Sequence, residues 1–359
     1  MQRVRVNLGP RSYDIAVGDR ADLAAFLREV CPAAKQLFVA FDASVTPQAT
    51  AIAAALEAAG WRVGAFAVPS GEGSKSLALT ARLYDALAAL PADRATPVVA
   101  VGGGVTGDLA GFAAATYNRG LPLVMVPTTL LAMVDSSVGG KVGVNHPAGK
   151  NLVGAFHQPA GVWIDPTFLD TLPVREYTSG LAEVVKYGVI LDPEFFSYLE
   201  ATAAAILARD PAAVAHVVTR CCRLKADVVE LDEREETGLR AKLNYGHTFA
   251  HAYETVAGYG TWLHGEAVSA GMVAASRLAE RLGRIPASVT ARQVALLTAF
   301  GLPTQPLPAW GIDAQLDVMR RDKKAVNGEL RFVLPSRLGE VEVVGGVPEA
   351  VVRGVLAPC

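Results

Sequence analysis

The chain has 359 residues, 51% of them hydrophobic, and its 33 basic and 35 acidic residues give a formal net charge of −2. At about 150 residues per domain this length favours two domains, and the near-neutral charge excludes the broad positive field that attracts nucleic acid or an anionic membrane surface. No apolar run reaches the roughly 18 residues that a membrane span needs. From the charge and the run lengths together, we expect no nucleic acid partner and no membrane association.

The cysteines and the first residues both bear on localisation. Cys31, Cys221, Cys222 and Cys359 form neither a CxxC pair nor a disulfide framework, which is typical of reduced thiols. The first six residues lack the apolar core and the cleavage site of a secretory signal. We therefore expect residue 1 to be the natural start and the protein to be cytoplasmic.

The first part of the chain predicts an α/β domain. Alternating residues at 3–8 and 13–17 predict a hairpin. Short apolar runs then alternate with segments of helical period, the pattern of βαβ units around a buried parallel sheet. The expected strands are 36–41, 62–68, 97–101 and 122–126, and the expected helices are 50–59, 77–90 and 108–117. Residues 128–159 follow neither period, and a long irregular segment in a compact domain is usually functional.

From residue 179 onward the pattern is mostly helical. Apolar residues recur at three- and four-residue spacing. The expected helices are 181–190, 200–208, 212–231, 247–256 and 266–282, and the expected strands are 331–334 and 341–344. We therefore predict an α/β N-terminal nucleotide-binding (Rossmann-like) domain at residues 1–175, followed by a mostly α-helical C-terminal domain at residues 176–359, whose residues for metal and substrate binding are considered below.

A glycine-rich turn follows the strand expected at 97–101. Gly102, Gly104 and Gly107 satisfy GxGxxG between a strand and a helix, where glycines let the backbone approach a pyrophosphate and the helix start favours negative charge. The motif follows a later strand, and no acidic residue about 20 positions on is placed to hold a ribose. A tight turn with close packing therefore remains an alternative explanation.

Charged residues near this turn also have two interpretations. Asp108 stands where dinucleotide sites favour an anion, but it could be an ordinary helix cap. Glu72 and Lys75 end another strand at the same edge of the predicted sheet, so they could reach a nucleotide or could simply be solvated loop residues.

Histidines and a carboxylate predict a metal site in the second half. His247 and His251 lie one helical turn apart, His264 opens the next helix, and Glu183 and Lys186 lie within one turn of an otherwise apolar helix. A buried charge needs a partner, and three protein ligands leave positions open for substrate, as in a catalytic zinc site. Spacing alone favours the His247/His251 pair but cannot decide which histidines bind.

Basic and amide side chains in the same segments predict an anionic substrate. Arginine and lysine suit carboxylate and phosphate recognition respectively, although any single one could be ordinary surface charge. The candidates are Arg119, Lys141, Lys150, Lys186, Lys225, Arg240, Lys323 and Lys324, with Asn151 and Asn244 as neutral donors.

Eight segments, in order along the chain, resemble one known family. They are residues 102–112, 126–131, 135–141, 149–151, 180–186, 244–251, 263–266 and 322–324. Together they resemble the 3-dehydroquinate synthases of the sugar phosphate cyclase superfamily, which implies a dehydroquinate synthase-like fold. The implied activity is the lyase reaction that converts 3-deoxy-D-arabino-heptulosonate 7-phosphate to 3-dehydroquinate and phosphate in the shikimate pathway of aromatic amino acid biosynthesis. Its steps are transient oxidation by NAD, phosphate elimination, reduction, ring opening and intramolecular aldol closure.

The resemblance also implies the cofactors and the site residues. Glu183, His247 and His264 would bind a divalent metal, zinc or cobalt, and His251 would contact substrate, which corrects the pair favoured by spacing. The implied NAD contacts are Asp42, Glu72, Lys75, Gly103, Gly104, Val105, Thr106, Gly107, Asp108, Thr128, Thr129, Asp135, Lys141, Lys150, Phe168 and Thr171. The implied substrate contacts are Arg119, Lys141, Asn151, Lys186, Lys225, Arg240, Asn244, His251 and the pair Lys323 and Lys324. A homodimer is also implied, with Arg119 reaching across the interface.

Other functions remain open. Another sugar phosphate cyclase, an inosose or valiolone synthase, would act on a substrate without a carboxylate and would leave Lys225 and Arg240 facing nothing. A metal-dependent polyol dehydrogenase would share the glycine turn but release NADH. The third alternative is a catalytically silent regulator that binds nucleotide or metal.

Overall fold

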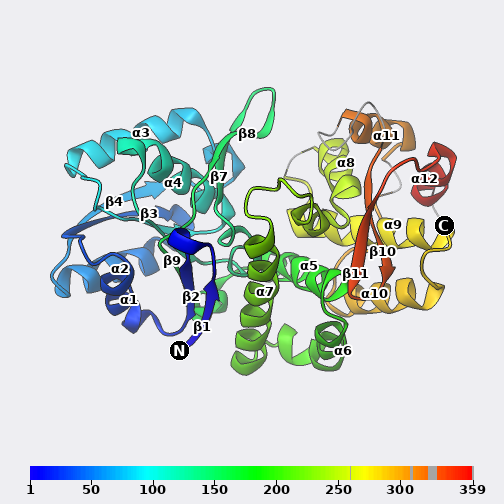
Figure 1. Cartoon of the computed structure of the whole chain (residues 1–359), viewed down its shortest axis with the longest axis horizontal. Coiled ribbons are helices and arrows are strands. Elements are labelled where there is room, and N and C mark those ends of the chain that lie inside the picture. The colour runs from blue at the N-terminus through cyan, green and yellow to red at the C-terminus, as the bar shows by residue number, and fades with distance from the viewer. Residues whose placement is uncertain (259, 308–309, 322–329, 358–359) are drawn as a thin grey trace. The chain divides into compact units, whose positions relative to one another are not determined.

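A seven-stranded sheet lies at the centre of the first half of the chain (Figure 1). The strand order is β1-β2-β9-β6-β5-β3-β4, and only the β1/β2 pair is antiparallel. The strands are β1 (Gln2–Val6), β2 (Tyr13–Val17), β3 (Gln36–Asp42), β4 (Arg62–Val68), β5 (Val98–Gly102), β6 (Leu123–Pro127) and β9 (Gly161–Ile164). The expected hairpin and parallel sheet are confirmed.

This structure is a computed structural model that describes residues 1–258, 260–307, 310–321 and 330–357. The chain forms two compact units. The first contains Met1–Leu172 and Val214–Arg234, and the second contains Pro173–Ala213 and Glu235–Cys359. Residues 214–234 thus belong to the first unit, although they lie within the range predicted for the second domain. None of the helices in the described ranges has the length and hydropathy needed to cross a membrane.

Helices surround the sheet of the first unit because its central strands are apolar on both faces. Every residue of β5 and β6 is buried, as expected for parallel strands covered by helices. These helices are α1 (Leu23–Val30), α2 (Thr46–Ala58), α3 (Leu77–Ala89) and α4 (Gly104–Thr116). The long helix α7 (Pro211–Leu231) contributes its residues from Val214 onward to this unit.

The segment expected to be irregular, residues 128–159, contains regular structure. A π-helical turn, η6 (Ala132–Ser136), follows β6, and an antiparallel hairpin of β7 (Lys141–His146) and β8 (Gly149–Phe156) comes next. Isolated π-helical turns are frequent at functional sites. The expectation of irregular structure was therefore wrong for most of this segment.

The second unit is mainly helical, as predicted. Its central helix is α9 (His264–Arg281), which packs against α5 (Val174–Ile190), α8 (His247–Ala257), α10 (Ala287–Ala299) and α12 (Glu349–Leu356). The remaining elements are α6 (Pro193–Leu207), the 3-10 turn η8 (Arg240–Asn244), α11 (Ile312–Arg321), β10 (Phe332–Arg337) and β11 (Glu340–Val344).

Candidate functional site

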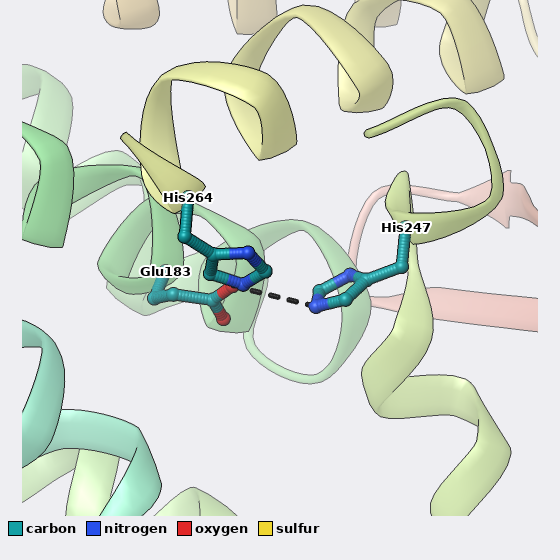
Figure 2. Close-up of side chains that lie close together, drawn as sticks. All are labelled: Glu183, His247 and His264. Carbon is teal, nitrogen blue, oxygen red and sulfur yellow. Dashed lines mark ion pairs between the residues drawn. The ribbon is translucent and has the colours of Figure 1, made fainter. Parts of the chain in front are cut away.

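Glu183, His247 and His264 form a cluster in the second unit, shown in Figure 2. The three come from α5 and from the first residues of α8 and α9. One ligand atom of each lies within 4.8 Å of the others. The Nε2 atoms of both histidines lie 3.7 Å from Glu183 Oε1. Two imidazoles and one carboxylate are a common donor set for catalytic zinc.

The surroundings of Glu183 fit a metal ion. Its side chain is 0% exposed, and neither carboxylate oxygen has a hydrogen-bond donor among the described residues. Lys186 forms an ion pair with Oε2, but the geometry is not that of a hydrogen bond. A buried carboxylate without hydrogen bonds is costly, and a divalent cation between Glu183 and the two Nε2 atoms would add ligand bonds to the ion pair with Lys186.

The second ring nitrogen of each histidine faces an oxygen. His247 Nδ1 lies 3.1 Å from the carbonyl oxygen of Tyr245, and His264 Nδ1 lies 3.4 Å from Glu254 Oε1. A proton on each Nδ1 would leave both Nε2 atoms available as ligands, a common arrangement around metals. In the absence of a metal ion, burial lowers the pKa of His264, but the carboxylates of Glu183 and Glu254 outweigh that effect and raise the pKa to about 10, so a metal at Nε2 would displace a proton.

Tyr245 is itself held firmly. Its side chain is fully buried, and its hydroxyl lies 3.0 Å from the Met272 carbonyl oxygen and 2.9 Å from Gln293 Oε1. Burial raises the pKa of Tyr245, so the hydroxyl stays protonated. The tyrosine therefore fixes the backbone just before His247.

Sequence reasoning did not identify Glu254 or the Tyr245 carbonyl. For Glu254 a signal exists, because His247, His251 and Glu254 follow one another at four- and three-residue spacing and so share one helix face. The His251 ring lies edge-on to that of His247 at 5.8 Å, but His251 is not a member of the cluster. The metal pair favoured by spacing alone is therefore not the group that the structure assembles.

Two of the other predicted substrate residues of the second unit are buried. Lys186 is 1% exposed and Arg240 is 3% exposed. Arg240 and Asn244 begin and end the turn η8, shortly before His247. Lys323 and Lys324 lie outside the described residues.

The glycine turn lies at a reversal of strand order in the first unit. The chain runs from β3 to β4 on one side and from β5 to β6 on the other. In parallel sheets a ligand binds beyond the carboxyl ends of the strands at such a switch point. Asp42 ends β3, and its Oδ2 lies 3.4 Å from the hydroxyl of Thr106 in the first turn of α4. The structure therefore brings two of the predicted NAD residues together.

Glycine is required in this turn by close packing. A Cβ on Gly102 would lie 2.7 Å from the Cβ of Thr106. Gly103 is the N-cap of α4, which begins at Gly104 and not near Asp108 as expected. A small hollow here is lined by Gly102, Gly103, Gly107, Ser136 and Ser137, among others. Both explanations given for the glycines, packing and ligand approach, are compatible with this geometry.

Asp108 lies beyond the first turn of α4, so it is not the helix cap. Lys75 Nζ donates to Asp108 Oδ2 at 2.5 Å and to Asn151 Oδ1 at 2.5 Å. Burial raises the pKa of Asp108, and the nearby Lys75 opposes that effect. The three residues, predicted separately as NAD and substrate contacts, therefore form one polar cluster.

Lys225 of α7 pairs with Asp135 of the π-helical turn η6. Its Nζ donates to the Asp135 carbonyl oxygen at 2.6 Å and also contacts the Asp135 carboxylate. One turn earlier on α7, the Cys222 thiol donates to the Met133 carbonyl oxygen at 3.3 Å. These contacts hold α7 to the turn and explain why this part of α7 belongs to the first unit.

The remaining predicted residues of the first unit are dispersed. The backbone N–H of Thr128 donates to the Gly102 carbonyl oxygen at 3.0 Å, and the Thr129 hydroxyl accepts a hydrogen bond from the Ala132 N–H at 3.2 Å. Elsewhere, Glu72 accepts from Asn145 at 2.6 Å, Phe168 is buried and Thr171 accepts from Gln48 at 3.2 Å. Lys141 and Lys150 lie on the hairpin strands β7 and β8, and Arg119 is exposed with a φ of 64°. The roles of all these residues stay predictions.

Comparisons with solved structures find close likenesses. A 2-deoxy-scyllo-inosose synthase complexed with carbaglucose-6-phosphate, NAD+ and Co2+ matches with a TM-score of 0.89 and 27% identity, over 99% of this chain and 99% of that one. The 2-epi-5-epi-valiolone synthase ValA from Streptomyces hygroscopicus subsp. jinggangensis 5008, with NAD+ and Zn2+ bound, matches with a TM-score of 0.86 and 29% identity, over 96% and 95% of the two chains. Maleylacetate reductase from Agrobacterium tumefaciens shares the fold alone, with a TM-score of 0.63 and 17% identity over 95% and 94%.

Family models match consecutive parts of the chain. The model described as 3-dehydroquinate synthase N-terminal matches residues 65–179, and the model described as 3-dehydroquinate synthase C-terminal matches residues 180–325. The two matches join without a gap and include all three residues of the metal cluster. The chain therefore belongs to the 3-dehydroquinate synthase family, within the sugar phosphate cyclase superfamily.

Proposed function

We propose that this sugar phosphate cyclase is a 3-dehydroquinate synthase, acting on 3-deoxy-D-arabino-heptulosonate 7-phosphate. The observation that carries the proposal is the match of both halves of the 3-dehydroquinate synthase model to consecutive residues, 65–179 and 180–325. The product would be 3-dehydroquinate, with phosphate released, and the pathway would be that of aromatic amino acid biosynthesis. A homodimer in the cytoplasm is part of the same proposal.

Glu183, His247 and His264 would hold a divalent metal, zinc or cobalt. Support comes from the buried Glu183 oxygens that lack hydrogen bonds and from the Co2+ and Zn2+ named with the two similar synthases. When bound, the metal would act as a Lewis acid toward substrate oxygens. Lys186, which pairs with Glu183, would add a second positive charge next to the metal ligands.

The turn at the ends of β3 and β5 would bind NAD. The turn lies at the switch point of the strand order, which supports NAD binding there, and NAD+ is named with both similar synthases. When bound, NAD would accept a hydride from a substrate hydroxyl and later return it, so that none is consumed. The N–H groups at the start of α4 would face the pyrophosphate, and Asp42 would be placed to accept a hydrogen bond from a ribose hydroxyl.

The cationic and amide side chains would hold the anionic ends of the substrate. A guanidinium can grip a carboxylate with two parallel hydrogen bonds, whereas an ammonium acts as a point charge toward phosphate. Within the second unit we assign substrate contacts to Lys186, Arg240, Asn244 and His251, and within the first unit to Arg119, Lys141, Asn151 and Lys225. Fixing both ends of a flexible substrate lowers the barrier by prior orientation.

An inosose or valiolone synthase is the second candidate. The similar solved structures support it more directly than they support the main proposal, because the synthases matched at 27% and 29% identity carry those names. The discriminating feature of this chain would be the pair of buried cations Lys225 and Arg240, 6% and 3% exposed, although Lys225 already contacts Asp135 and does not face an empty space. These two would suit a substrate that carries a carboxylate.

A substrate panel tests the proposal. The purified chain, supplied with NAD and with zinc or cobalt, would be incubated in parallel with 3-deoxy-D-arabino-heptulosonate 7-phosphate, glucose 6-phosphate and sedoheptulose 7-phosphate, and released phosphate and carbocyclic product would be quantified. We expect turnover of the first substrate only. Turnover of glucose 6-phosphate or sedoheptulose 7-phosphate in its place would establish the second candidate.

A further inference from the structure

Glu254 occupies a distinct position beside the metal cluster. It lies on α8, and its Oε1 is 3.4 Å from His264 Nδ1, on the side of the ring opposite the Nε2 atom that faces Glu183. Its side chain is 12% exposed. A carboxylate is thus placed against the second nitrogen of one predicted ligand without belonging to the ligand cluster.

The two histidines are oriented by different kinds of oxygen. His247 Nδ1 faces the backbone carbonyl of Tyr245, which cannot be changed by substitution without moving the chain. His264 Nδ1 faces a charged side chain that can be replaced. The contact of 3.4 Å is an ion-pair distance, and a charged acceptor attracts a ring N–H more strongly than a neutral one does, so Glu254 should help to fix the orientation of the His264 ring.

Helix α8 therefore has two connections to the cluster. It begins with His247, and seven residues later Glu254 reaches His264 at the start of α9. The helices pack closely enough that a Cβ on Gly271 of α9 would lie 2.4 Å from the Gly246 carbonyl oxygen, directly before α8. One rigid helix thus fixes both imidazoles relative to each other.

We propose that Glu254 is a positioning residue, which holds His264 with its proton on Nδ1 and its Nε2 directed at the metal. The inference rests on the proposed metal binding by Glu183, His247 and His264. The positioning role goes beyond metal binding by the three ligands, because Glu254 lies outside the ligand set and would still control metal affinity and ligand geometry. Partners of metal-bound histidines typically account for about 10- to 100-fold in affinity.

The test is Co2+ titration of metal-free protein, followed by the visible absorption spectrum of the cobalt form. Glu254→Ala removes the acceptor, and Glu254→Gln keeps an acceptor oxygen without the charge. The matched control is Glu200→Ala and Glu200→Gln, because Glu200 lies on α6 of the same unit and pairs with Arg292 at 2.6 Å, away from the cluster residues. Circular dichroism and thermal midpoints report on folding.

We expect Glu254→Ala to weaken Co2+ binding about 10- to 100-fold and to change the positions and intensities of the cobalt bands. Glu254→Gln should fall between Glu254→Ala and wild type, and the Glu200 variants should match wild type. If Glu254→Ala does not fold, Glu254→Gln alone decides. Wild-type affinity and spectrum in a folded Glu254 variant would overturn the positioning role while leaving the metal site intact. Absence of stoichiometric Co2+ binding by the wild type would instead overturn the proposed metal site, and the inference with it.

Discussion

The hydroxyl oxygen of Ser179 accepts a hydrogen bond from the backbone N–H of Gly265 at 3.1 Å, where α5 and α9 meet without a side chain between their backbones. A Cβ on Gly265 would lie 1.9 Å from the Ser179 carbonyl oxygen. Four residues after Ser179 on α5 comes Glu183, and Gly265 directly follows His264 on α9. The contact therefore sets the distance between a carboxylate and an imidazole of the metal cluster.

Gly265→Ala should separate these helices and weaken the metal site. Because the clash is with backbone, we expect a loss of about 1–3 kcal/mol in the free energy of unfolding, together with weaker Co2+ binding, measured by urea unfolding and metal titration. Gly311→Ala is the control, since a Cβ there would meet nothing within 4 Å and the glycine does not have positive φ. Wild-type stability and Co2+ affinity in Gly265→Ala would contradict the close-packing argument.

His264→Ala and His251→Ala should differ in metal content. His264 belongs to the cluster with Glu183 and His247, whereas His251 does not. We expect His264→Ala to lose stoichiometric zinc, and His251→Ala to retain zinc but to turn over substrate more slowly, measured by metal analysis after dialysis and by phosphate release. The reverse pattern of metal loss would restore the His247/His251 pair that spacing alone favoured.

Lys75→Met should destabilise the first unit in a pH-dependent way. Burial already raises the pKa of Asp108, with Lys75 opposing it, so removing the cation should raise that pKa further. Asp108 ionises at its ordinary pKa in the unfolded chain but at a higher pKa in the folded variant. The loss in free energy of unfolding, relative to wild type, should therefore grow as pH rises above the ordinary carboxylate range.

The expected deficit is about 1–3 kcal/mol near neutral pH, the cost of a buried polar group without its partner, and a smaller loss at about pH 4. Urea unfolding at the two pH values measures it. Lys35→Met, at an exposed lysine of the same unit, controls for charge removal. Equal losses at both pH values would show that Asp108 ionisation is not responsible.

Arg240→Lys should distinguish recognition of a carboxylate from general anion binding. Arg240 is 3% exposed, and lysine keeps its charge but cannot form two parallel hydrogen bonds. We expect KM for 3-deoxy-D-arabino-heptulosonate 7-phosphate to rise about tenfold, equivalent to about 1.4 kcal/mol, with kcat less affected. The control is Arg292→Lys on the surface. An unchanged KM in a folded Arg240→Lys variant would remove the main argument against the second candidate function.

Much of the fold was predictable because its signals are local. The βαβ alternation and the helices α5, α6, α8 and α9 follow from apolar periodicity and are present, whereas α10, α11 and α12 were not predicted. The hairpin of β7 and β8 was missed because no residue of β8 is buried, so its sequence lacks a regular apolar alternation. The place of Val214–Arg234 was missed because it depends on the tertiary contacts of Lys225 and Cys222 with η6.

From spacing alone, the site was predictable in its residue types but not in its grouping. Spacing nominated His247, His251 and His264, whereas the family resemblance predicted the group Glu183, His247 and His264 that the structure brings together. Likewise, the sequence marks Glu72, Lys75 and Asp108 only as charged residues near a turn. In the structure Lys75 donates hydrogen bonds to Asp108 and Asn151. Such partnerships join residues far apart in the chain, so no local pattern encodes them.

The most direct test of the whole account is the number of phosphates released per NAD. Metal-loaded protein would be incubated with 3-deoxy-D-arabino-heptulosonate 7-phosphate and a small amount of NAD, while inorganic phosphate and the absorbance of NADH are followed together. The account predicts many phosphates per NAD, 3-dehydroquinate as the product and no lasting NADH. Stoichiometric NADH without phosphate release would contradict it and indicate a dehydrogenase.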